Sequence, residues 1–128
     1  MMNKRDILNR LFVENNLTEQ DVFKHKFYTI ITRSGIDKIQ SINNIEITYN
    51  LEFNSMDCKC IIIIAAATMG DKAIETYGEA SPSNNSNSYP VAMAEKRAMS
   101  RAVLKLAGFY EHQVFGEDEA EAFKRSNN

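Results

Sequence analysis

The sequence predicts an α+β fold: an antiparallel β-meander of about four strands, one long helix packed on a face of the sheet, and short N- and C-terminal helices. Three observations predict it. Residues 45–53 alternate apolar and polar side chains, residues 58–68 form an almost continuous apolar run, and residues 91–107 carry apolar side chains at helical spacing. Strands followed by one long helix fit a sheet covered on one face. The length of 128 residues suits a single domain, 1–128.

An N-terminal helical segment is expected at residues 1–25. Four apolar side chains within residues 4–15 recur at the spacing of one helix face. Thr18 followed by Asp21 resembles a further helix start, because a hydroxyl side chain can cap free amides and an acid favours the first turn. This segment is therefore expected to precede the sheet as short helical structure.

The sheet itself is expected at residues 26–80. Residues 26–33 are rich in β-branched and aromatic side chains, and Ser34 and Gly35 interrupt that strand before one or two helical turns. The alternating strand at 45–53 is expected to be half exposed, and the apolar strand at 58–68 to be central and more deeply buried. A turn at 69–71 then leads to an antiparallel strand at 72–80.

Three segments complete the chain: a polar loop at 81–89, a basic helix at 90–108 and an acidic C-terminal segment at 109–128. Pro90 suits the first turn of the helix, and Gly108 suits its end. Residues 117–125 are expected to form a short terminal helix, because acids stand in its first turn.

Composition excludes several classes of protein. The net charge of −2 argues against a strongly basic nucleic-acid binder, although cations concentrate in the long helix and acids follow it. No run approaches the roughly 20 apolar residues that span a bilayer, and the N-terminus lacks the apolar stretch of a secretory signal. The two cysteines, Cys58 and Cys60, are too close in a strand to pair and are expected to be reduced. A cytoplasmic, soluble protein with no membrane association is expected.

The long helix has two apolar faces. The larger stripe has mostly small side chains, which would let the helix backbone approach the sheet closely: Val91, Ala94, Ala98, Ala102 and Leu106. A smaller patch comprises Met93, Leu104 and Ala107. Together with the aromatic residues of segment 109–115, this second patch predicts an interface beyond the domain's own core. A homo-oligomer is therefore expected.

Three cations of the same helix lie four residues apart between these faces: Arg97, Arg101 and Lys105, with Lys96 beside them. Like charges at this spacing repel one another. Phosphate groups would neutralise the row and release counterions, so it is a candidate track for a polyanion. The plainer interpretation is a solvated helix face whose cations meet acids from the sheet or the tail.

The polar loop adds further candidate contacts. Its Ser and Asn side chains precede the start of the helix, where free backbone amides already favour anions. Asn85 and Asn87 are candidate hydrogen-bond donors to nucleic acid, and Tyr89 is expected to be an exposed ring on which a base could stack. Tyr77 is either a second such ring or a core residue of its strand.

Residues 75–110 resemble the signature region of single-strand DNA annealing proteins, which include the eukaryotic double-strand-break-repair annealer and its phage relatives of the Erf and Sak type. That family pairs a β-meander with a helix of the form A-x-K-R-A-x-x-R-A, followed by L-x-x-x-G. The matching positions here are Ala94, Lys96, Arg97, Ala98, Arg101, Ala102, Leu104 and Gly108. With the preceding strand order, the resemblance covers about residues 26–119.

The resemblance implies a non-enzymatic protein that binds single-stranded DNA along the basic groove of an oligomeric ring or filament and anneals strands in recombination or repair. It makes Lys96, Arg97, Arg101 and Lys105 candidate phosphate contacts, needs no cofactor, and suggests a phage or mobile-element origin. The acidic isoelectric point and the short chain depart from the better-known members of the family.

Two other function classes compete with this interpretation. A Mg²⁺-dependent nuclease could use Asp57 and Lys59, in a D-x-K spacing, with Glu46 or Glu52 on the adjacent strand. Asp57 also suits plain turn chemistry. A protein-interaction or structural module without DNA binding would show the same apolar helix faces as an oligomeric annealer, and only a binding measurement separates the two.

Overall fold

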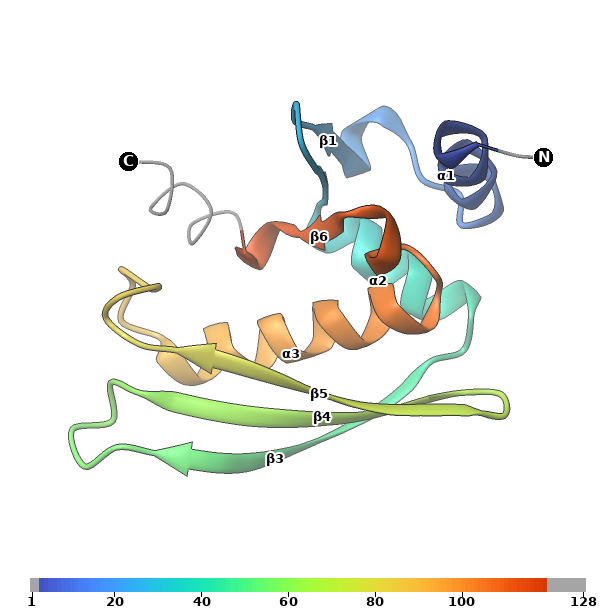
Figure 1. Ribbon diagram of the computed structural model, residues 1–128. Helices are drawn as coiled ribbons and strands as arrows, with labels where there is room; N and C mark the ends of the chain where they lie inside the picture. The colour runs from blue at the N-terminus through green and yellow to red at the C-terminus, as the bar shows by residue number, and fades with distance from the viewer. Residues whose placement is uncertain (1–2, 120–128) are drawn as a thin grey trace.

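The computed structural model describes residues 3–119 and confirms an α+β fold. Two three-stranded sheets and three α-helices make up the described part of the chain (Figure 1). The helices are α1 (Lys4–Glu14), α2 (Arg33–Ile42) and α3 (Pro90–Leu106). The strands are β1 (Val22–Lys24), β2 (Thr29–Ile31), β3 (Glu46–Asn54), β4 (Ile61–Met69), β5 (Lys72–Ala80) and β6 (Val114–Gly116).

The larger sheet is an antiparallel meander in the order β3–β4–β5. It has three strands rather than the expected four, because the strand predicted at residues 26–33 joins the second sheet instead. There β2 lies between β1, which is antiparallel to it, and β6, which is parallel. The parallel partner comes from residues 114–116, far away in the sequence, so local patterning could not predict this pairing.

Helix α3 packs along one face of the larger sheet, against β4 and β5 (Figure 1). Ala94, Ala98 and Ala102 are fully buried at this contact, as the small side chains of the stripe predicted. A Cβ atom at Gly78 of β5 would lie 1.9 Å from the carbonyl oxygen of Ala94, so only glycine permits this approach. The hydroxyl of Thr76 donates to the carbonyl of Ala98 at 2.6 Å.

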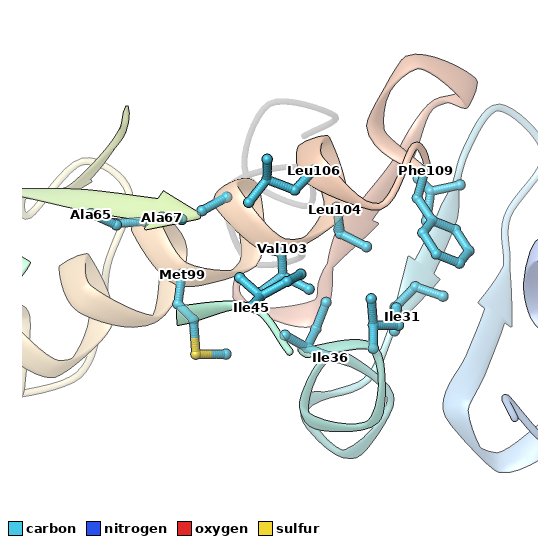
Figure 2. Packing of buried hydrophobic residues seen from close by; sticks show 14 residues of the cluster. Ile31, Ile36, Ile45, Ala65, Ala67, Met99, Val103, Leu104, Leu106 and Phe109 are labelled. Atoms are coloured by element: carbon cyan, nitrogen blue, oxygen red, sulfur yellow. The ribbon is translucent and has the colours of Figure 1, made fainter. Parts of the chain in front are cut away.

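The opposite side of α3 is covered by α2 and the second sheet (Figure 1, Figure 2). Leu104, Phe109 and Val114 are fully buried there. The expectation that Leu104 belongs to an exposed interface patch is therefore wrong, because the domain itself supplies the cover. Val91, assigned to the buried stripe, is 52% exposed because it stands in the first turn, near the end of the sheet.

The segments at the two ends of the described chain close this second layer. Phe12 of α1 stacks on Phe109 at 6.2 Å between ring centres. Residues 19–21 form a short 3₁₀ turn rather than a second helix, and the carboxylate of Asp21 accepts from the backbone amide of Thr18 at 2.9 Å. Residues 117–119 form another 3₁₀ turn, and the rest of the expected terminal helix lies outside the described residues.

The outer face of the larger sheet, opposite α3, carries no other element of the described chain (Figure 1). Ile62 and Ile64 of the central strand point to this face and are only half-buried, and Phe53 and Tyr77 beside them are 48% and 54% exposed. An apolar surface is thus left uncovered. No helix within residues 3–119 is long and apolar enough to cross a lipid bilayer.

Candidate nucleic-acid interface

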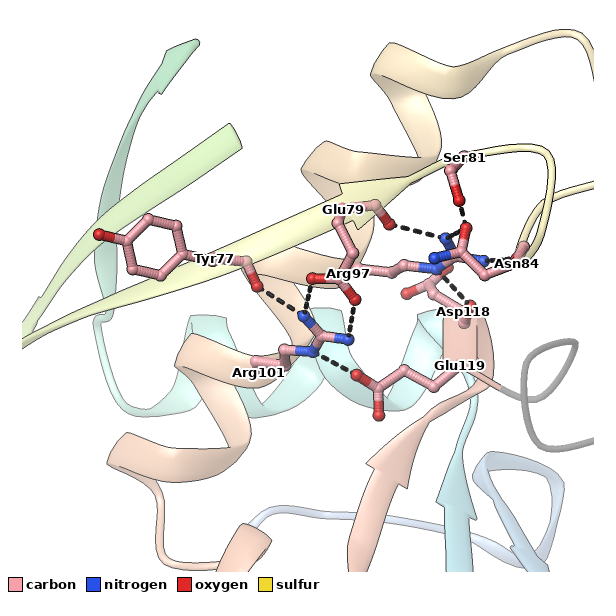
Figure 3. Close-up of polar contacts among 8 residues, drawn as sticks. All are labelled: Tyr77, Glu79, Ser81, Asn84, Arg97, Arg101, Asp118 and Glu119. Atoms are coloured by element: carbon pink, nitrogen blue, oxygen red, sulfur yellow. Dashed lines mark hydrogen bonds and ion pairs between the residues drawn. The ribbon is translucent and has the colours of Figure 1, made fainter. Parts of the chain in front are cut away.

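Arg97 lies inside the protein, with 1% of its surface exposed. Its guanidinium group donates to the carbonyl oxygens of Glu79, Asn84 and Asp118 and to the side-chain oxygen of Asn84, at 2.7–3.1 Å (Figure 3). Strand β5, the polar loop and the turn at 117–119 all meet at this one cation. The expectation that Arg97 lies outside the core on a solvent-facing row is therefore wrong.

Arg101, one turn further along α3, is held by two carboxylates. Its Nη atoms form a bidentate pair with Glu79 at 2.9 Å, its Nε atom binds Glu119, and Nη1 also donates to the carbonyl of Tyr77 (Figure 3). Burial alone would lower the pKa of Arg101, but the two carboxylates outweigh it and raise the pKa above its ordinary value. This cation meets acids from the sheet and the tail, as the plainer interpretation of the helix face states.

The remaining cations of the helix are more accessible. Lys105 is exposed, and its ammonium group lies 4.9 Å from the ring centre of Tyr110. Lys96 is partly exposed. The expected row of phosphate contacts thus divides into two arginines that bind the protein and two lysines that face solvent.

The polar loop at 81–89 uses most of its short side chains on itself. The side-chain oxygen of Asn84 accepts from the amide of Ser81 at 2.9 Å, and Asn85, which is 8% exposed, pairs with the backbone of Asn87. Tyr89 is 67% exposed, as expected. Asn87 and Tyr89 thus remain accessible candidates, and the buried Asn85 is a less accessible one.

A basic and aromatic surface that the sequence interpretation did not single out lies at residues 24–28, here called the hairpin tip, which joins β1 to β2. Five consecutive residues, Lys24, His25, Lys26, Phe27 and Tyr28, form a tight turn closed by a backbone hydrogen bond from His25 to Tyr28 at 2.8 Å. Phe27 is 72% exposed and so is Phe23 just before the tip. The ammonium group of Lys26 lies 5.4 Å from the ring centre of Phe27.

Ring contacts connect the hairpin tip to the end of α3. His25 stacks on Tyr28 at 4.3 Å, Phe115 meets the edge of Tyr28 at 6.4 Å, and Tyr110 meets Phe115 at 5.2 Å. Lys105 then lies over Tyr110. The hairpin tip, Phe115, Tyr110 and Lys105 together form a continuous surface, here called the aromatic track, with lysines at both ends.

The signal for this surface is present in the sequence FKHKFY at 23–28, in which aromatic and basic residues alternate. Its last three residues fall in the segment 26–33, which is predicted from the sequence to be a strand. The aromatic residues of segment 109–115, which include those that complete the track, are predicted from the sequence to form an oligomer interface instead. Only the parallel pairing of β2 with β6 brings the two segments together.

Within the described part of the chain, the nuclease alternative finds no assembled site. The carboxylate of Asp57 accepts from the hydroxyl of Ser55 and from the backbone amide of Lys59, and these bonds lower its pKa. Glu46 pairs with Thr68, at the end of the sheet away from that turn. Among residues 3–119, no three His, Cys, Asp or Glu side chains are grouped to hold a metal ion.

No protein-family model, curated protein or solved structure matches this chain. The resemblance to annealing proteins thus stays a prediction.

Proposed function

We propose that the protein binds single-stranded nucleic acid without reading its sequence, and that the aromatic track carries this binding. The supporting observation is the hairpin tip, which presents the exposed Phe27 directly after Lys26 and three residues after Lys24. Bases stack on accessible aromatic rings and phosphates bind adjacent cations, and neither contact depends on base identity. The biological process proposed for it, by resemblance, is strand annealing in recombination or repair in the cytoplasm, without catalysis.

The track suits a single strand better than a duplex. Single strands expose the faces of their bases, whereas stacking within a duplex hides them. Several rings of the track lie edge to face and are half-buried, so a base would contact the ring surfaces that remain, at Phe27 above all. Glu111 is exposed beside the track and reduces its positive charge, which predicts modest affinity and a shallow salt dependence, because few phosphates are neutralised.

The test is a binding titration with a labelled thymidine oligonucleotide. Phe27→Ala should lower the affinity by about tenfold, since stacking contributes ~1–3 kcal/mol per base. Met56→Ala is the control, because Met56 is also a fully exposed apolar side chain but lies in the turn between β3 and β4. Equal losses in both variants, or none in Phe27→Ala, would place the binding surface elsewhere.

Annealing also requires that two strands be brought together, which an oligomer achieves. The Leu104 patch that suggested an oligomer is buried, but the outer face of the larger sheet offers an uncovered apolar surface. A homo-oligomer thus stays part of the proposal. Light scattering at micromolar concentration, with and without the oligonucleotide, measures it, and a monomer in both conditions contradicts annealing.

The same outer face supports the second candidate, a protein-interaction module. Ile62, Ile64, Phe53 and Tyr77 form an apolar surface with no cover from the described chain. Self-association in light scattering together with no oligonucleotide binding would favour this candidate over the first.

A further inference from the structure

Each of the three acids that follow β6 binds a different donor. Glu117 accepts from the backbone amide of Arg33, at the start of α2, at 2.5 Å. Asp118 accepts from the hydroxyl of Ser100 at 2.7 Å, and Glu119 pairs with Arg101. A helix-start amide, a hydroxyl and a guanidinium group are the donors that proteins use to bind phosphate groups.

The carboxylates that bind Arg101 carry more negative charge than its guanidinium group carries positive charge. Glu79 already neutralises it through two hydrogen bonds of 2.9 Å, and Glu119 is a second carboxylate on the same guanidinium group. The single guanidinium group of Arg101 faces two carboxylates, those of Glu79 and Glu119, so these three groups carry a formal charge of −1. One carboxylate is thus in excess.

The excess charge lies at one end of the aromatic track. Lys105 follows Arg101 by one helical turn and contacts Tyr110. Burial raises the pKa of Tyr110, and the negative charge of Glu119 raises it further, so Glu119 is electrostatically close to that ring. A strand that follows the track past Tyr110 would bring its next phosphate toward Arg101, where Glu119 now lies.

We propose that the acidic turn Glu117–Glu119 is an internal phosphate mimic, which occupies the Arg101 end of the track and lowers the affinity for nucleic acid. This inference rests on the proposed function of the track. Binding of a longer strand then displaces Glu119 from Arg101, whereas Glu79 keeps Arg101 in place. Because Arg97 binds the carbonyl of Asp118 and the fully buried Val114 anchors β6, the backbone of the turn stays in place and only the side chain of Glu119 has to move.

The experiment compares three variants that change the net charge equally. Glu119→Gln and Glu79→Gln each remove one carboxylate from Arg101 and keep the shape of the side chain. Glu75→Gln removes an exposed carboxylate from the outer face of β5 and is the matched control. Affinity for a labelled thymidine oligonucleotide is titrated against salt concentration, and the melting temperature of each variant is measured in parallel.

Glu119→Gln should raise the affinity on the order of tenfold, because a like charge within a few ångströms of a phosphate is removed. The slope of log affinity against log salt should steepen by about 0.7, as one more phosphate is neutralised. Glu79→Gln should also raise the affinity. This second variant keeps the test decisive if Glu119→Gln, at a buried position, does not fold. Glu75→Gln should give less than a twofold change.

Three outcomes would overturn the inference. An equal gain in Glu75→Gln would assign the effect to net charge. Unchanged binding in the Glu119 and Glu79 variants, with the parent protein still binding, would show that the turn is structural and leave the proposed function standing. If neither the parent nor these variants bind the oligonucleotide, the proposed function fails as well, whereas binding by the variants alone would support the mimic directly.

Discussion

The arginines of α3 and the lysines of the hairpin tip carry the same charge and differ in what surrounds them. Arg97 and Arg101 have acceptors within the domain, including three backbone carbonyls around Arg97. Lys24 and Lys26 are exposed on a tight turn, with aromatic rings as neighbours. The spacing of cations along a helix therefore predicts where they lie on the helix, but not whether the protein itself or a ligand binds them.

The chemistry of the two side chains accounts for the division. A guanidinium group presents five donors in a planar fork, so it can satisfy several carbonyl oxygens in a buried position. A lysine ammonium is a strongly hydrated point charge and stays at the surface unless it is paired. Arg97 therefore serves as a connector between β5, the polar loop and the C-terminal turn, and this role costs its availability to phosphates.

Replacing Arg97 with Met is expected to have the largest effect on stability. The change leaves four acceptor atoms around the guanidinium without their donor, so the free energy of unfolding should fall by about 3–5 kcal/mol. Lys96→Met, at the neighbouring and partly exposed position, should change it by less than about 0.5 kcal/mol. Chemical denaturation of both variants measures the difference, and a loss below ~1 kcal/mol for Arg97→Met would contradict the connector role.

Asp21→Asn tests a second internally satisfied charge. The carboxylate of Asp21 is buried and binds Lys38 at 2.6 Å, Ser34 at 2.8 Å and the amide of Thr18. The bond to Lys38 and the other hydrogen bonds hold its pKa below the ordinary value of 3.8. At neutral pH the variant should lose about 1.5–3 kcal/mol of unfolding free energy, because hydrogen bonds to a charged group are replaced by neutral ones.

The same variant also tests how the free energy of unfolding depends on pH. Since the folded pKa of Asp21 is lowered, its contribution to stability is complete above the ordinary value of 3.8 and is lost as the pH falls below it toward the folded pKa. The parent protein should therefore lose stability below about pH 3.8 more steeply than Asp21→Asn does. Equal acid slopes for both proteins would mean that Asp21 is not ionised in the way its contacts indicate.

Ala98→Leu tests the helix–sheet contact that positions Arg97 and Arg101 of α3. Ala98 is fully buried against β5, so a larger side chain should overpack the contact and cost about 1–3 kcal/mol. Ala92→Leu introduces the same side chain at an exposed position of the same helix and should be nearly neutral. Thermal unfolding compares the two, and equal melting temperatures would contradict the close approach of α3 to the sheet.

The elements with strong local patterns were predictable from the sequence. The alternation at 45–53, the apolar run before Thr68 and the alanines of the long helix correspond to β3, β4 and α3 within a few residues. These patterns reflect burial by neighbouring segments of a meander, where each strand pairs with the next one along the chain. Sequence patterns and tertiary packing point to the same structure there.

The candidate site was less predictable because its parts meet through long-range contacts. The parallel pairing of β2 with β6 joins residues 29–31 to residues 114–116, and no local pattern indicates it. Likewise, the partners of Arg97 come from β5, the polar loop and residue 118, so its burial could not be deduced from the helix alone. The hairpin tip is exposed because it projects from the second sheet, whose position beside α3 depends on these long-range contacts (Figure 1).

Replacing both Lys24 and Lys26 with Gln has the smallest expected effect on stability. It tests directly whether the lysines of the hairpin tip, unlike the arginines of α3, bind the ligand. Both side chains are exposed at the hairpin tip, so the free energy of unfolding should change by less than about 0.5 kcal/mol. If each neutralises one phosphate, the slope of log affinity for single-stranded DNA against log salt should flatten by about 1.4.

The matched control for this change is the double substitution Lys59→Gln and Lys72→Gln, which removes two exposed lysines, one in the turn before β4 and one at the start of β5. Since the net charge changes equally, a general electrostatic effect would flatten both slopes alike and contradict a local contact at the hairpin tip. Flattening confined to the control would place the strand near Lys59 or Lys72, of which Lys59 lines a depression of about 420 Å³ with Asn85, Asn87 and Pro90. Flattening confined to the hairpin variant, with unchanged stability, would establish that the exposed lysines meet the ligand while the arginines of α3 hold the fold.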